Sequence, residues 1–105
     1  MTDSTRGQLE LLVLAAVEAG ASHGYAVIEA LRARSAGAFD LPEGTVYPAL
    51  HRLEAKQLLA SHWADDSGRR RRVYRLTSRG RGALREGRRD WRSFARAVAA
   101  VVGSP

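Results

Sequence analysis

The residues of this chain best suited to chemistry are two basic groups that lie close together in the sequence. His51, Arg52 and Lys56 belong to one short amphipathic segment, and an unbroken block of four arginines occupies residues 69–72. Guanidinium and ammonium groups bind phosphate oxygens, and the fork of an arginine also matches the two acceptors of guanine in the major groove of DNA. These residues therefore indicate recognition of a polyanion.

Arg52 is the best candidate for a bidentate contact to guanine, whereas Tyr47 and His51 are better suited to positioning a helix. The alternative is that Arg52 pairs with Glu54 or with a backbone phosphate, because roughly half to two-thirds of protein–DNA hydrogen bonds go to the backbone. In the arginine block, strand alternation sends successive side chains to opposite faces. We therefore expect only part of the block to touch DNA at once.

Catalytic and metal sites find no support in the sequence. The three histidines, His23, His51 and His62, are dispersed and lack the spacing of metal ligands, and the chain has no cysteine. Ser22 precedes His23 directly, but a nucleophilic triad also needs a third orienting group and an oxyanion hole. We therefore expect neither an enzyme nor a cofactor.

The charge of the chain is concentrated in one region. The 105 residues carry a net charge of +6, and an apolar fraction of 45% suits a single globular domain. Residues 66–92 hold eleven arginines against three acidic residues, a balance of +8, whereas the remainder sums to −2. A basic face on a near-neutral body fits a polyanionic partner, and the alternative is a merely solvated run of charge.

Neither a membrane span nor an export signal is predicted. The longest uncharged apolar run, residues 11–17, is far too short to cross a bilayer. The first six residues lack the basic start and the cleavage site of a signal peptide. We expect a cytoplasmic protein with no membrane partner.

Hydrophobic spacing and turn residues predict a mainly α-helical fold with one small β-hairpin. Helices are expected over residues 6–19 and 22–34, the second capped by Ser22, followed by a short extended piece at 39–41 and a third helix. Strands are expected over 58–63 and 73–76 around a turn at 65–68. A last helix should run from Thr77 or Ser78 to about residue 102. This order is that of a winged helix-turn-helix domain over residues 1–77, followed by a long dimerisation helix over residues 78–105.

The third helix is the expected recognition helix. A start at Thr45 places Pro48 in the first turn, where its missing N–H costs nothing, whereas a start at Pro42 places it deeper and implies a kink. The expected buried stripe is Val46, Leu50 and Leu53. The residues left for the outer faces are Thr45, Tyr47, Pro48, Ala49, His51, Arg52 and Lys56.

The last helix carries a heptad pattern. Its apolar members, at the a and d positions, are Leu84, Trp91, Phe94, Val98 and Val101, with Gly87 as a gap. Such a seam is typical of helix pairing between subunits, and the first helix offers a broad apolar face beside it. We therefore expect a homodimer, the alternative being that Trp91 and Phe94 pack on their own domain.

With these motifs assembled, the chain resembles the PadR family of bacterial transcriptional regulators. The matching residues are His-Gly-Tyr at 23–25, the stretch Gly-Thr-Val-Tyr-Pro-Ala-Leu-His-Arg-Leu-Glu at 44–54, and the wing at 68–77 followed by Gly80. The resemblance covers about residues 9–85. It implies a homodimeric winged-helix repressor that binds a pseudo-palindromic operator in double-stranded DNA, and the single C-terminal helix resembles the small subfamily.

The resemblance also implies site residues. By position, the DNA contacts would be Tyr25, Thr45, Tyr47, Pro48, Arg52, Lys56, Gly68, Arg69 and Arg70. Some small members hold flat aromatic compounds between their subunits, and the corresponding ligand and dimer interface here would be Leu12, Ala16, Trp91, Phe94 and Val98. The alternative function is a winged-helix adaptor whose basic patch docks an acidic protein.

Two departures from the family pattern concern glycine. Gln57 stands where a glycine usually ends the recognition helix. Gly80, Gly82 and Gly87 weaken the early part of the last helix, each by about 1 kcal/mol relative to alanine. We expect the turn into the hairpin at Gln57 to differ. The three glycines should loosen the dimer, let the helix move when a ligand binds, or reflect plain sequence drift.

Overall fold

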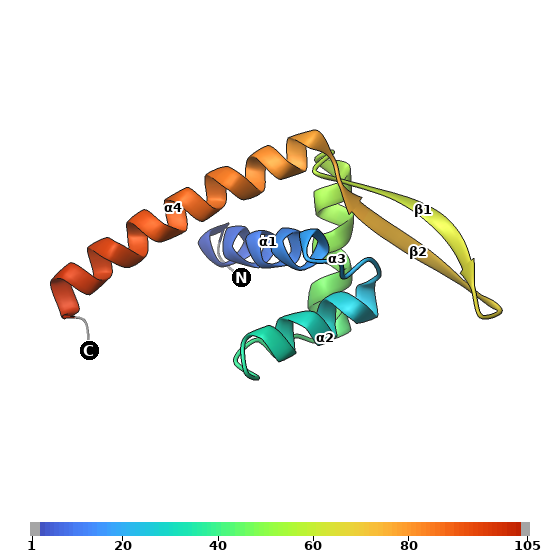
Figure 1. The fold of residues 1–105 in the computed structure, drawn as a ribbon, viewed down its shortest axis with the longest axis horizontal. Coiled ribbons are helices and arrows are strands. Elements are labelled where there is room, and N and C mark those ends of the chain that lie inside the picture. The colour runs from blue at the N-terminus through green and yellow to red at the C-terminus, as the bar shows by residue number, and fades with distance from the viewer. Residues whose placement is uncertain (1–2, 104–105) are drawn as a thin grey trace.

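The computed structural model describes residues 3–103, which form four helices and one two-stranded antiparallel hairpin (Figure 1). The elements are α1 (Asp3–Glu18), α2 (Gly24–Arg34), α3 (Glu43–Ala55), β1 (Leu59–Asp66), β2 (Arg69–Leu76) and α4 (Ser78–Val102). The predicted fold class, mainly α with a small hairpin, is confirmed. In Figure 1 the hairpin and the C-terminal half of α4 extend from the cluster of α1, α2 and α3 on opposite sides.

One core joins α1, α2 and α3 to the base of the hairpin and the first turns of α4. The predicted stripe of Val46, Leu50 and Leu53 is fully buried, which confirms the orientation of α3. Ala49 was expected on the outer face, and that prediction is wrong because the residue is fully buried as well. It lies three positions after Val46 and four before Leu53, so helical spacing places it in the same stripe.

Two helix starts differ from or refine the predictions. His23 rather than Ser22 caps α2, with its Nδ1 accepting a hydrogen bond from the backbone N–H of Ala26 at 3.3 Å. Helix α3 begins at Glu43 after the N-cap Pro42, so of the two alternatives the early start is the one observed. Pro48 therefore lies inside the helix, where it has no N–H to donate to the carbonyl four residues back.

The hairpin is longer than predicted. Its strands pair from Leu59 opposite Leu76 to Asp66 opposite Arg69, so the whole arginine block belongs to β2. Ser67 and Gly68 alone form the turn, with φ angles of 52° and 77°. Two consecutive positive φ values are typical of the type I′ turn, whose twist matches that of the strands it joins. The sequence prediction ended the strands early because aspartate and arginine are poor indicators of strand. Residues 39–41, expected to be extended, form no strand.

Helix α4 begins where the sequence placed it, and its cap is Thr77. The Thr77 Oγ1 accepts a hydrogen bond from the N–H of Gly80 at 2.9 Å. Gly87 has a packing role, because a Cβ at that position would lie 2.6 Å from Cδ1 of Leu11. The glycine in the heptad pattern is therefore a place where α1 approaches α4 closely. A Cβ at Gly82, in contrast, would meet only the end of the Arg85 side chain, at 3.9 Å.

Gln57 occupies a backbone position that favours glycine. Its φ is +64°, and the N–H groups of Gln57 and Leu58 bond back to the carbonyls of Glu54 and Leu53, the pattern of a Schellman motif. We predict that Gln57→Gly raises the free energy of unfolding by about 1 kcal/mol, because glycine adopts this conformation without a Cβ penalty. Urea denaturation measures the change. Gln57→Ala, which keeps the Cβ, is the control and should give no gain.

Candidate nucleic-acid interface

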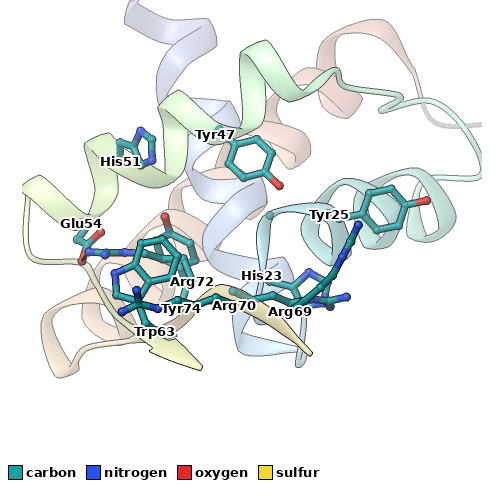
Figure 2. A pocket seen from close by; sticks show the side chains of 12 residues that line it. His23, Tyr25, Tyr47, His51, Glu54, Trp63, Arg69, Arg70, Arg72 and Tyr74 are labelled. Atoms are coloured by element: carbon teal, nitrogen blue, oxygen red, sulfur yellow. Dashed lines mark hydrogen bonds and ion pairs between the residues drawn. The ribbon is translucent and has the colours of Figure 1, made fainter. Parts of the chain in front are cut away.

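A groove with a volume of about 810 Å³ lies between α2, α3 and the hairpin (Figure 2). It combines four consecutive arginines with aromatic and imidazole rings. The residues that line it are His23, Gly24, Tyr25, Tyr47, His51, Glu54, Trp63, Arg69, Arg70, Arg71, Arg72 and Tyr74. One carboxylate against four guanidinium groups makes the groove strongly positive, and such a concave basic surface attracts polyanions.

Trp63 organises the arginines on the inner face of the hairpin. Strand pairing places it opposite Arg72, and the guanidinium carbons of Arg70 and Arg72 lie 4.9 and 5.1 Å from the centre of its ring. These are cation–π distances. The Arg72 guanidinium also donates to Ser61 Oγ at 2.8 Å and reaches Glu54 of α3 at 3.5 Å. Arg72 therefore fixes the hairpin to α3, and Arg70 projects beyond it.

Arg71 points to the other side of the hairpin and contacts α2. Its guanidinium lies 2.9 Å from Nε2 of His23, the residue whose Nδ1 caps α2. A neutral imidazole has a free lone pair on only one of its two nitrogens, so the cap at Nδ1 and a hydrogen bond from Arg71 to Nε2 require different tautomers of His23. The contacts of the block alternate, with Arg70 and Arg72 on Trp63 and Arg71 on His23, yet all four arginines line the same groove.

The helices bring two tyrosines into the same groove. Tyr25 of α2 is 60% exposed. Tyr47 of α3 lies across Gly24, where an added Cβ would be only 2.6 Å from the tyrosine hydroxyl. Glycine at position 24 therefore lets the ring of Tyr47 rest against the start of α2. His51 is exposed one turn further along α3.

Arg52 and Lys56 lie on the opposite flank of α3 and face α1. The carboxylate of Glu10 accepts from Nε of Arg52 at 3.2 Å and from Nζ of Lys56 at 2.8 Å. Glu10 is only 8% exposed. Its burial raises the pKa of the carboxyl, but hydrogen bonds and charge attraction from Lys56 and Arg52 outweigh burial and hold the pKa below its ordinary value of 4.5. Arg52 therefore pairs with Glu10, and the alternative in which it pairs with Glu54 is not the arrangement observed.

The model of the PadR-like family of transcriptional regulators matches residues 13–86, which include α2, α3 and the hairpin just described. The chain belongs to this family. A PadR family transcription regulator from Clostridium difficile is 31% identical, with a TM-score of 0.79 over 90% of this chain and 98% of that one. A PadR family regulator from Eggerthella lenta is 30% identical, with a TM-score of 0.80 over 98% of this chain and 88% of that one.

Comparison with curated proteins gives the same family. A transcriptional regulator of Mycobacterium tuberculosis is 56% identical over 55 residues, which are 52% of this chain and span 51% of that protein. The chain therefore matches only about half the length of that relative. A transcriptional regulator from Clostridium thermocellum, at 24% identity and a TM-score of 0.84, supports the fold alone. The family and these neighbours are transcriptional regulators and not enzymes, in agreement with the prediction.

The predicted DNA contacts of this PadR-family chain lie on two different flanks of α3. Tyr25, Tyr47, Arg69 and Arg70 line the groove, whereas Arg52 and Lys56 lie with Glu10 outside it. The remaining predicted contacts are Thr45 and Pro48, which are half-buried and exposed on α3, and Gly68 in the hairpin turn.

Sequence reasoning missed several groove residues. Trp63, His23 and Arg72 were not among the predicted contacts, although all three line the groove. The sequence carried a signal for one pair, because counting outward from a two-residue turn at 67–68 places Trp63 opposite Arg72. Glu10 was missed too, and its signal was a single charge inside an apolar run.

The C-terminal half of α4 carries a row of exposed apolar side chains. Trp91 and Phe94 are 53% and 58% exposed, so the alternative that they pack on their own domain is wrong. Their ring centroids are 6.1 Å apart, and they border a shallow hollow of about 290 Å³. Of the two predicted residues on α1, Leu12 is half-buried against the core and Ala16 is fully buried, so the side chain of Ala16 offers no surface.

The described part of the regulator, residues 3–103, contains no helix that is long and apolar enough to span a membrane. Across the same residues there is no group of three or more histidine, aspartate or glutamate side chains placed to hold a metal ion.

The Glu10 ion pairs predict an acid dependence of stability. The pKa of Glu10 is lower in the folded than in the unfolded chain, so the carboxylate stabilises the fold at neutral pH, and this contribution is lost as the pH falls below about 4.5. We therefore expect the melting temperatures of the natural chain and of Glu10→Gln to differ most at neutral pH and to converge in acid. Melting curves from pH 7 to pH 3 measure this, and two parallel profiles would contradict it.

Proposed function

We propose that this PadR-family regulator is a homodimeric repressor that binds double-stranded DNA through α3 and the hairpin. The observation that carries the proposal is the groove, in which four arginines and an exposed recognition helix form one positive surface. The arginines supply the phosphate contacts that fix the protein on the duplex, and α3 supplies the contacts to base edges. The proposed contacts are Tyr25, Thr45, Tyr47, Pro48, Arg52, Lys56, Gly68, Arg69 and Arg70.

The proposed dimer is formed through α4. Its exposed apolar residues, Trp91, Phe94, Val98, Val101 and Val102, form a surface that water solvates poorly, and a second copy of the same helix covers it. Two subunits joined in this way hold two recognition helices about one DNA turn, ~34 Å, apart. The operator we expect is a pseudo-palindrome with that spacing.

The proposed effector is a small aromatic or hydrophobic molecule at the dimer interface. Trp91, Phe94 and Val98 of α4 supply its contacts, together with Leu12 of α1. An effector that releases the repressor must bind the two arrangements of the dimer with different affinity, typically by about 1–3 kcal/mol. Its site on α4 allows it to change the separation of the recognition helices without touching DNA.

The test of DNA binding is a footprint of the purified protein on the region upstream of its own coding sequence, at two salt concentrations. We expect a protected site with twofold symmetry. With about six to ten phosphate contacts, affinity should fall about 10³–10⁵-fold between 50 and 200 mM salt. Binding no tighter than about 10⁻⁴–10⁻⁶ M on every duplex would instead support the adaptor that docks an acidic protein.

The effector is tested by tryptophan fluorescence. The chain has two tryptophans, Trp63 in the groove and Trp91 on α4, so Trp63→Phe leaves an emission that reports on α4 alone. We expect the dye 8-anilinonaphthalene-1-sulfonate to quench this emission. Trp91→Phe, which leaves only Trp63, is the control and should show much less quenching. Equal quenching in both variants would contradict a site on α4.

A further inference from the structure

Glu10 holds both cations on the flank of α3 that lies outside the groove. Its two carboxylate oxygens are divided between Arg52, at 3.2 Å, and Lys56, at 2.8 Å. The side chains of Arg52 and Lys56 are 30% and 54% exposed, whereas the carboxylate side is nearly closed to solvent. A phosphate arriving from solvent can therefore reach the cations but not the carboxylate that holds them.

We propose that Glu10 is an internal counter-ion that competes with DNA phosphates for Arg52 and Lys56. A carboxylate and a phosphodiester present the same chemistry to a guanidinium or an ammonium group, namely paired anionic oxygens. Each contact that the recognition helix makes to phosphate through these cations weakens a contact to Glu10. The proposal rests on the DNA binding proposed above and identifies the residue that limits it.

The position of Glu10 on α1 makes the competition unavoidable. Its neighbours in the sequence and along the helix, Leu9 and Val13, are buried in the core, so α1 does not follow the cations toward DNA unless the packing of the core itself shifts. Arg52 and Lys56 must instead leave the carboxylate or remain partly neutralised. If the cations leave, the carboxylate of Glu10, a residue that is only 8% exposed, loses both of its partners. A buried charge without a partner is costly.

The same helix contacts α4, so the competition can respond to the effector. Leu11 of α1 lies against Gly87 of α4, and Glu18 of α1 forms an ion pair with Arg88 of α4 at 2.7 Å. A displacement of α4 that moves α1 also moves the Glu10 carboxylate relative to α3. Glu10 thereby joins the proposed effector surface to two cations of the recognition helix.

Elution from a heparin column tests the competition, because heparin is a polyanion without base sequence. The double variant Arg52→Gln/Lys56→Gln removes the same two charges in the natural chain and in Glu10→Gln. We expect the double variant to lower the eluting salt concentration clearly more in the Glu10→Gln background, where the cations have no competitor. The matched background is Glu18→Gln, which removes one acidic charge from the same helix but leaves α3 untouched.

Equal losses in all three backgrounds would overturn the proposal, as would a smaller loss with Glu10→Gln. Circular dichroism confirms that each variant is folded. On a short duplex of arbitrary sequence, Glu10→Gln should also steepen the slope of log K against log salt by about one to two units per subunit. Glu18→Gln should leave that slope nearly unchanged.

A second measurement is made on the natural chain, and a variant serves only to assign one resonance. The Nε–H resonance of Arg52, assigned by its loss in Arg52→Lys, should shift when a heparin oligosaccharide replaces Glu10 as its partner. No shift at saturation would overturn the proposal. Failure of the repressor function shows in the footprint, whereas failure of the competition shows in heparin binding, so the two outcomes are distinguishable.

Discussion

Replacing Trp91 and Phe94 by serine is expected to dissociate the proposed dimer and to weaken binding to the proposed operator by about 10²–10⁴-fold. Both side chains are more than half exposed in the single chain, and their removal takes away the largest apolar area of α4. Two linked recognition helices bind with avidity, which a monomer lacks. Sedimentation equilibrium measures the first effect, and titration of the footprinted duplex measures the second.

The control for this variant is Phe39→Ser. Phe39 is 41% exposed and lies between α2 and α3, away from the apolar surface of α4, so its loss changes surface polarity without touching the proposed interface. It should leave both the mass in solution and the operator affinity unchanged. Non-specific binding should survive in the Trp91 and Phe94 variant, since the groove is intact. A dimer that persists in that variant would place the interface elsewhere.

The fold followed from the sequence wherever apolar spacing was strong. The stripe on α3 and the extent of α4 were predicted because their apolar residues recur at three and four positions. The hairpin was predicted too short, since β1 and β2 continue through Asp65 and Arg69, whose side chains carry no apolar alternation. There the turn residues Ser67 and Gly68 determine the register, and only backbone geometry shows it.

The candidate site was predicted by residue type but not by arrangement. The basic block and the recognition helix were identified, yet their division into a groove flank and an α1 flank was not. Glu10 precedes Arg52 by 42 residues, so no local pattern could indicate that they meet. The cation–π stack on Trp63 depends in turn on the exact strand pairing, which the sequence left open.

The glycines of α4 show the same limit. From the sequence, Gly80, Gly82 and Gly87 were equivalent weaknesses in a helix. In the structure the backbone of Leu58 lies against Gly80 and the side chain of Leu11 lies against Gly87, whereas only a flexible arginine lies near Gly82. Gly80 and Gly87 therefore permit close packing, and their effect is not limited to a weaker helix.

Among the described glycines, Gly80 has the least room for a side chain, and its substitution is expected to cost the most stability. A Cβ at Gly80 would overlap the carbonyl oxygen of Leu58 and lie 3.0 Å from its carbon. This carbonyl cannot move away cheaply, because the N–H and the hydroxyl of Thr77 both bond to it at 3.2 Å. Those bonds join the end of the hairpin to the start of α4.

Gly80→Ala is therefore expected to lower the free energy of unfolding by about 3 kcal/mol, the cost of forcing the backbone apart in a packed core. The matched variant is Gly82→Ala, two residues along the same helix, where the added methyl meets nothing nearer than a flexible arginine 3.9 Å away. Higher helix propensity should make Gly82→Ala more stable by up to about 1 kcal/mol. Urea denaturation of both variants measures the difference. Equal shifts would mean that Leu58 and α4 are not held together in solution as the structure has them, and the hairpin would then be free to move relative to α4.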